Sequence, residues 1–96
     1  MTLRERFERF DADHPEVYEQ LCSLTRRWIE RGRARWSIWS AFAVLRWERR
    51  MAGLPAADEL YKLNNNYTGY YARKVMAENP DLAGVFELRR MKDEAA

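Results

Sequence analysis

The chain has 96 residues, 47% of them apolar, and a formal net charge of +2. This length allows one core, so we predict a single helical domain over residues 1–96 with a disordered tail at residues 92–96. The only cysteine, Cys22, excludes an internal disulfide and a thiolate metal cluster, as is typical of a reducing cytosol. The N-terminus is charged, and the longest apolar run, Ala41 to Leu45, is far too short to span a membrane. We therefore expect a cytoplasmic protein without membrane contact.

The charges are unevenly distributed along the chain. Eight arginines and two glutamates between Cys22 and Arg50 give this middle segment +6, whereas the segments before and after it carry −3 and −1. Basic surfaces attract phosphate groups. Most of these arginines lie in the predicted last turns of helices, where they complement the helix dipole without any ligand. Arg33 and Arg35 lie between two predicted helices, and the dipole does not explain them.

Apolar residues recur at helical spacing in the first third of the chain. Thr2 is suited to cap a short first helix with Phe7 and Phe10 on one face, which the segment from Asp11 to Asp13 would break. Asp13 would then cap a second helix that has a proline in its first turn and ends near Gly32. The predicted core face of this second helix comprises Val17, Leu21, Leu24 and Trp28.

Ser37 is the predicted cap of a third helix that runs to about Met51. It carries one apolar stripe formed by Ile38, Phe42 and Leu45 and a second formed by Trp39, Ala43 and Trp47. A helix that is apolar around much of its circumference is normally buried, so we predict that this helix is the central one. The tryptophans of the chain are expected mainly in the core.

The last part of the chain predicts two more helices. Residues 56–63 fit either one helical turn or a short extended piece. A fourth helix should begin in the asparagine run at residues 64–66 and end at Asn79, because Pro80 disfavours helix at the preceding residue. Asp81 is suited to cap a short last helix containing Leu82, Val85 and Phe86. The predicted class is all-α, a compact bundle of about five helices.

The fourth helix carries the residues that suggest a function. Its predicted core arc contains Tyr67, Thr68, Tyr71, Ala72, Val75 and Met76. The opposite arc contains Asn66, Gly69, Tyr70, Arg73, Lys74 and Ala77 and no acidic residue. Asparagine amides can read adenine, and basic side chains contact phosphate. The candidate DNA-binding residues are therefore Asn65, Asn66, Tyr70, Arg73 and Lys74, with Arg33 and Arg35 contacting the DNA backbone.

Two features leave this interpretation open. An asparagine run is more often a helix-capping loop than a base reader. The third helix, its connection and the polar-faced fourth helix follow the general plan of a helix-turn-helix. About a dozen residues separate the two helices, whereas the simple motif uses a turn of about three or four, so the unit would be a variant of that motif.

No pattern in the sequence predicts catalysis or a cofactor. His14 is the single histidine, and neither it nor Cys22 has partners spaced for a metal site. The serines lack a base at matching helical positions, and there is no glycine-rich phosphate loop. We expect a protein that is not an enzyme and has no metal, catalytic residue or cofactor.

Five segments together resemble a group of short, uncharacterised phage and prophage proteins. They are Phe10 with His14–Tyr18, Ile38 with Leu45–Trp47, Tyr61–Tyr67, Tyr71–Arg73 and Asn79–Arg89, and the Lys-Leu-Asn-Asn-Asn-Tyr segment is the most specific. The resemblance covers nearly the whole chain. It implies a bacterial or phage cytosolic setting and assigns no activity and no site residues.

Two functions follow as hypotheses. The first is a small phage-encoded DNA-binding protein that contacts double-stranded DNA through the fourth helix. The alternative is a small protein-interaction module that docks on a host or phage protein, with Trp36 as its exposed anchor. A DNA-binding protein this small normally recognises a two-fold symmetric DNA site with two copies. We therefore also expect a homodimer that buries aromatics of the Trp39, Ala43 and Trp47 stripe.

Overall fold

The computed structural model of the chain describes residues 1–53 and 65–87, and of Asn65 only the backbone. Within these ranges the chain forms four α-helices and two short 3-10 turns, and no strand. The helices are α1 (Leu3–Asp13), α2 (Pro15–Glu30), α3 (Ile38–Met51) and α4 (Thr68–Glu78), and the turns are η2 (Asn65–Tyr67) and η3 (Pro80–Leu82). The predicted all-α class is confirmed.

The predicted helix starts at Thr2 and Ser37 are confirmed by their capping hydrogen bonds. The Thr2 hydroxyl accepts from the Glu5 N–H at 3.1 Å, and the Glu5 carboxylate accepts from the Thr2 N–H at 3.1 Å, which completes a capping box. The Ser37 hydroxyl accepts from the Trp39 N–H at 3.1 Å. These contacts occupy backbone donors that the first turn of a helix leaves without partners.

The junction between α1 and α2 differs from the prediction. Helix α1 continues through Asp11 to Asp13, and His14, not Asp13, lies between the two helices. The His14 N–H donates to the Phe10 carbonyl, which extends the last turn of α1. Pro15 then begins α2 directly, because proline is well suited to the first position of a helix.

The last predicted helix is only the turn η3. Gly84 adopts φ +79°, a left-handed conformation that stops further helical turns. Beyond it, the Val85 carbonyl accepts from the Trp36 N–H at 3.1 Å, so this segment runs beside the connection between α2 and α3. Arg89, the expected tail at residues 92–96 and the ambiguous segment at residues 56–63 lie outside the described residues.

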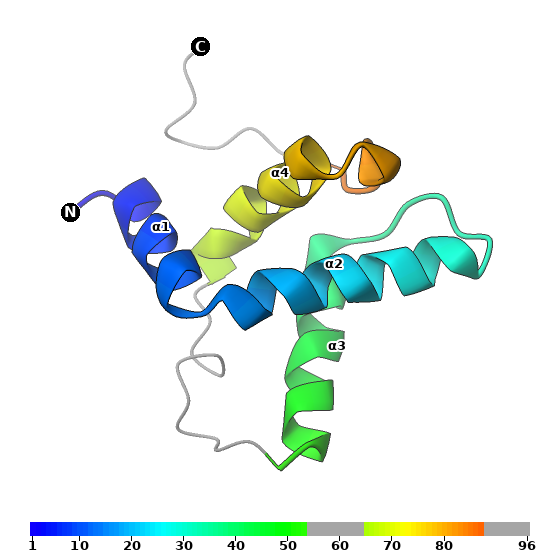
Figure 1. Cartoon of the computed structure of the whole chain (residues 1–96), viewed down its shortest axis with the longest axis horizontal. Helices are drawn as coiled ribbons and strands as arrows, with labels where there is room; N and C mark the ends of the chain where they lie inside the picture. The colour runs from blue at the N-terminus through cyan, green and yellow to red at the C-terminus, as the bar shows by residue number, and fades with distance from the viewer. Residues whose placement is uncertain (54–64, 88–96) are drawn as a thin grey trace.

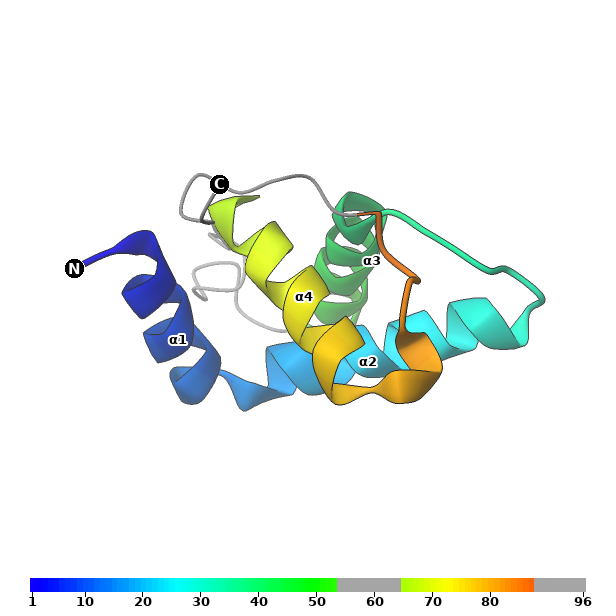
Figure 2. The same ribbon diagram turned by 90° about the horizontal axis from the view of Figure 1, so that it is seen from above.

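Helix α2 packs against each of the other three helices. Figure 1 shows α1 at one end of α2, α4 along one side, and α3 leading away from α2 at a steep angle. Seen from above, α4 lies between α1 and α3 (Figure 2). The prediction that the third helix is central is wrong, because Trp39 and Trp47 of its second stripe are exposed to solvent.

The core gathers the predicted inner faces of all four helices. Among the described residues, the largest fully buried side chains include Tyr71, Phe42, Leu21, Leu45, Leu82, Val17 and Val75. The Tyr71 ring meets the Phe7 ring of α1 at 4.8 Å and the Phe42 ring of α3 at 5.8 Å, both edge-on. Such contacts stabilise beyond the area they bury, so one side chain of α4 joins three helices.

The two faces of α3 should respond differently to truncation. Phe42→Ala removes a fully buried ring and should lower the free energy of unfolding by about 3–5 kcal/mol. Trp47→Ala removes an exposed ring of the same helix and should change it by less than about 0.5 kcal/mol. Urea denaturation at ~2 µM, which limits any contribution from association, measures both. Equal losses from the two variants would contradict this arrangement of α3.

Candidate functional site

The outward side of α3 is the most apolar exposed helix face among the described residues. Because successive residues turn by about 100°, one arc of α3 collects Ile38, Ala41, Phe42 and Leu45, all buried. The opposite arc, here called the α3 outer face, comprises Trp39, Ala43, Val44, Trp47 and Met51. Every one of these five residues is exposed.

The two tryptophans contribute most to the α3 outer face. Trp39 is 54% and Trp47 is 61% exposed, and Met51, at the end of the helix, is 70% exposed. The core already has its aromatic contacts through Phe42 on the other side, so packing among residues 1–53 and 65–87 does not account for these two rings. Exposed apolar groups that lie together on one face are typical of contact surfaces.

Charged side chains border the α3 outer face without covering it. Glu48 accepts from Arg27 of α2 at 2.7 Å, and the Arg46 guanidinium lies 6.0 Å from the centre of the Phe42 ring. Arg49 is buried and donates to Gln20 of α2 at 2.9 Å. Ser40 and Arg50 are the polar residues within the outer arc, which therefore holds no acid.

The structure brings together three of the predicted DNA-binding residues, but in a groove and not on an open surface. Tyr70, Arg73 and Lys74 of α4 line a shallow groove of about 280 Å³ against α1. The other lining residues are Arg4, Phe7, Glu8 and Ala77. Helix α1 thus packs beside part of the α4 side that was expected to approach DNA, at Tyr70 and Lys74.

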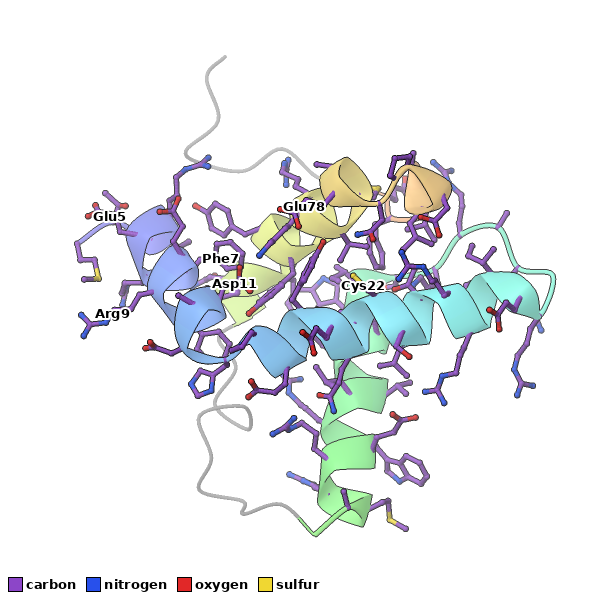
Figure 3. The ribbon with its side chains drawn as sticks, viewed as in Figure 1. Glu5, Phe7, Arg9, Asp11, Cys22 and Glu78 are labelled. Atoms are coloured by element: carbon purple, nitrogen blue, oxygen red, sulfur yellow. The ribbon has the colours of Figure 1, made fainter. Side chains whose placement is uncertain are left out.

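Tyr70 corrects the sequence prediction most clearly. Its side chain is only 5% exposed, and its ring stacks on Phe7 with centroids 5.1 Å apart. The Arg4 guanidinium also lies over the Tyr70 ring, 5.4 Å from its centre. Figure 3 shows Phe7 and Asp11 projecting from α1 toward α4, whereas Arg9 points away. Tyr70 is therefore part of the packing between α1 and α4.

The basic residues of α4 also contact the domain itself. Lys74 forms an ion pair with Asp11 of α1, and its ammonium group lies 4.3 Å from the centre of the Tyr18 ring. Arg73 donates to the Gly69 carbonyl of its own helix at 3.3 Å. These contacts direct both cations toward neighbouring groups of the same chain.

The asparagine run and the two loop arginines lie elsewhere. Asn66 is exposed in η2, before the start of α4, and the side chain of Asn65 lies outside the described part of the chain. Arg33 and Arg35 are exposed in the connection between α2 and α3, at the end of α2 opposite α1 (Figure 1). The six predicted residues whose side chains are described therefore do not form one continuous surface.

The connection between α2 and α3 is held by aromatic and backbone contacts. The Trp28 indole donates to the Arg35 carbonyl at 2.8 Å, and its ring stacks on Trp36 at 5.2 Å. The Arg33 guanidinium lies 5.3 Å from the centre of the Trp28 ring. Trp36 is half-buried and also stacks with Phe86, so it is not the exposed anchor that the sequence suggested.

The single cysteine and the single histidine of the chain are each held within the domain. Burial raises the pKa of the Cys22 thiol, which keeps it in its less reactive protonated form. Figure 3 places Cys22 on the side of α2 that faces α4. His14 contacts Glu16 at 3.5 Å and packs on the Phe10 ring. Among residues 1–53 and 65–87, no three His, Cys, Asp or Glu side chains are grouped to hold a metal ion.

No protein-family model, curated protein or solved structure matches the chain. Within the described residues, no helix is both long enough and apolar enough to cross a membrane. The site must therefore be interpreted from its own geometry.

The sequence predicts two roles for the stripe of Trp39, Ala43 and Trp47: part of a buried central helix and the contact of a homodimer. The exposure of both tryptophans contradicts the first of these and leaves the second as a prediction. Val44 and Met51 were not predicted as part of a site. Their helical positions relative to Trp47 could have identified them, because all of them fall in the arc opposite Phe42.

An ion pair between the C-terminal half of α2 and the turn η3 predicts a specific pH dependence. Arg26 donates to Asp81 at 3.0 Å and to Asn79 at 2.7 Å, and its hydrogen bond lowers the pKa of the Asp81 carboxyl below the ordinary 3.8. A lowered pKa stabilises the fold above the unfolded value, and this stabilisation is lost as the pH falls through the folded value. Asp81→Asn should therefore melt below the parent chain at pH 6 and converge with it well below pH 3.8.

Thermal melts monitored by circular dichroism at both pH values measure this convergence. Arg26→Gln is the matched control, because it removes the other partner of the same pair. The double variant should melt like Arg26→Gln, since that variant already lacks the Arg26–Asp81 interaction. A constant difference between Asp81→Asn and the parent chain at all pH values would contradict the assignment.

Proposed function

We propose that this chain is a non-enzymatic protein-interaction module that docks through the α3 outer face. The observation that carries the proposal is the pair Trp39 and Trp47, both more than half exposed on the side of α3 opposite the core. Tryptophan is among the residues that contribute most binding energy when a partner covers it.

The composition of the α3 outer face favours a protein partner over a nucleic acid. It offers indole rings, a methyl group, an isopropyl group and a thioether, and Arg50 is the only charged residue within its arc. Nucleic acids are bound mainly through several cationic contacts to phosphates. An apolar centre with a charged border, here Arg27 with Glu48, is instead the usual plan of a protein interface.

The surroundings of Cys22 and His14 support a role without catalysis. Cys22 is buried with a raised pKa, and His14 packs against Phe10 and Glu16. The phage or prophage origin rests on the resemblance of the sequence, and the cytoplasmic location rests on that resemblance and on the single cysteine. Both belong to the same proposal.

A photo-crosslinking amino acid with a small aliphatic diazirine side chain, placed at Ala43, tests the proposal. Ala43 lies between the two tryptophans, so a crosslinker there should capture a protein partner in a nuclease-treated lysate of cells that naturally encode the chain. The same group at Glu19, an exposed position of α2, is the matched control and should capture little. Products that are sensitive to protease and absent from the control are expected. Equal labelling from both positions, or none from Ala43, would reject the α3 outer face as a docking surface.

DNA binding is kept as a second candidate because of one exposed basic segment. Arg31, Arg33 and Arg35 are all exposed within five residues, and no acidic residue lies between them. Such a segment is suited to sequence-independent contacts with phosphate groups. In this second candidate, the DNA contacts only the segment from Arg31 to Arg35. Asn66 in η2 and Arg73 in α4 do not form a continuous surface with that segment.

Fluorescence anisotropy with a random DNA duplex tests this second candidate. Binding through the loop should be detectable at ~10 µM protein in about 50 mM salt and should weaken steeply as salt increases. Arg33→Ala together with Arg35→Ala should remove about two units from the salt slope. Arg73→Ala serves as the control from α4. A loss confined to Arg73→Ala would return the site to the fourth helix, and no binding in low salt would exclude the candidate.

A further inference from the structure

We propose that the partner on the α3 outer face is a second copy of the same chain, packed antiparallel about a two-fold axis. This inference rests on the proposed function of that face and names its occupant. The argument comes from the order of large and small residues along α3 and from the charges beside them.

Four residues of the α3 outer face form one continuous ridge. Trp39, Ala43, Trp47 and Met51 follow one another at intervals of four residues. Residues at this spacing lie on the same oblique row of a helix surface, and two helices pack by setting such rows into each other's grooves. The row alternates a large ring, a small methyl group and a second large ring before it ends in a flexible thioether.

This order is complementary to itself only in the antiparallel direction. With the axis near the level of Leu45, Trp47 of one copy faces Ala43 of the other, and symmetry repeats the same contact on the other side of the axis. Trp39 then faces Met51, and sulfur–aromatic contacts are favourable. A parallel pair would set Trp47 against Trp47 and leave Ala43 opposite Ala43, so the large residues would collide and the small ones would leave a gap.

The charges agree with the antiparallel arrangement. No acidic residue lies in the arc of the α3 outer face, and its single cation, Arg50, lies near one end. Antiparallel pairing places the two Arg50 residues at opposite ends of the contact, each close to Trp39 of the other copy. An arginine over an indole ring is a favourable cation–π geometry.

The exposed area is that of a small interface and predicts a weak, concentration-dependent dimer. Trp39, Trp47 and Met51 are 54%, 61% and 70% exposed. With about 150–250 Å² for each fully covered aromatic side chain, these residues and their neighbours supply on the order of 400 Å² per copy, roughly half of a standard interface. The C-terminal half of α3 extends away from α1, α2 and α4 (Figure 1), so these helices leave room for a second copy.

A size-swap experiment tests the pairing directly. Light scattering of the parent chain at ~50 µM in about 150 mM salt should give twice the chain mass of 11.5 kDa. Ala43→Trp alone should weaken dimerisation at least tenfold through two ring collisions, and Trp47→Ala alone should weaken it at least tenfold through two gaps. An equimolar mixture of these two variants should dimerise again, because at both contacts the Ala43→Trp copy presents a ring where the Trp47→Ala copy presents a methyl group.

Circular dichroism spectra that coincide with the parent's verify that each variant is folded. The dimer should also persist at ~0.5 M salt, because its contacts are apolar, whereas DNA binding would not. A mass of 11.5 kDa that persists as the parent concentration rises, or a mixture that stays monomeric, would overturn the second copy as the occupant. If the Ala43 crosslinker still captured a larger protein, the docking function would survive and only its partner would change.

Discussion

The contact that organises this domain is the ring of Tyr71 between two other aromatic rings. It is fully buried on α4, with Phe7 of α1 on one side and Phe42 of α3 on the other. Because Phe7 also stacks on Tyr70, the same cluster draws α1 across the part of α4 that the sequence would expose. Because Phe42 turns one face of α3 inward, the opposite face with Trp39 and Trp47 must turn outward. One buried cluster thus decides which helix surface is covered and which is available.

The basic middle of the sequence does not become one basic surface. Its arginines are distributed among separate contacts between elements: Arg26 with Asp81, Arg27 with Glu48, and Arg49 with Gln20. The exposed pairs of Arg26 and Arg27 contribute little stability. The buried Arg49 links α3 to α2. A charge of +6 counted along the chain therefore overstates the field that a ligand would meet. The exposed segment from Arg31 to Arg35 is the part of it that stays together.

Local rules predicted most of the helices, and they failed where a distant segment decides the outcome. Thr2 and Ser37 were recognised as caps because capping depends on residues three or fewer positions away. The inner face of α4, with Tyr71 and Val75, followed from helical periodicity. The burial of Tyr70 did not, because periodicity assigns a residue to a side of its own helix and says nothing about a second helix, here α1, packing on that side. The two exposed tryptophans were misjudged for the converse reason, since an apolar stripe is the same in sequence whether or not anything covers it.

The apolar character of the α3 outer face is not a requirement of the fold. The inward arc of α3 meets α2 and α4 through Ile38, Phe42 and Leu45, and polar residues at the outward positions would leave those contacts unchanged. Elsewhere the described surface follows that pattern: the outward positions of α1 and α2 include Arg6, Arg9, Glu19 and Ser23. Two tryptophans in water carry a solubility cost that surface helices normally avoid. The cost is removed when another surface covers them, and the spacing of Trp39, Ala43, Trp47 and Met51 is what makes a second α3 suited to do so.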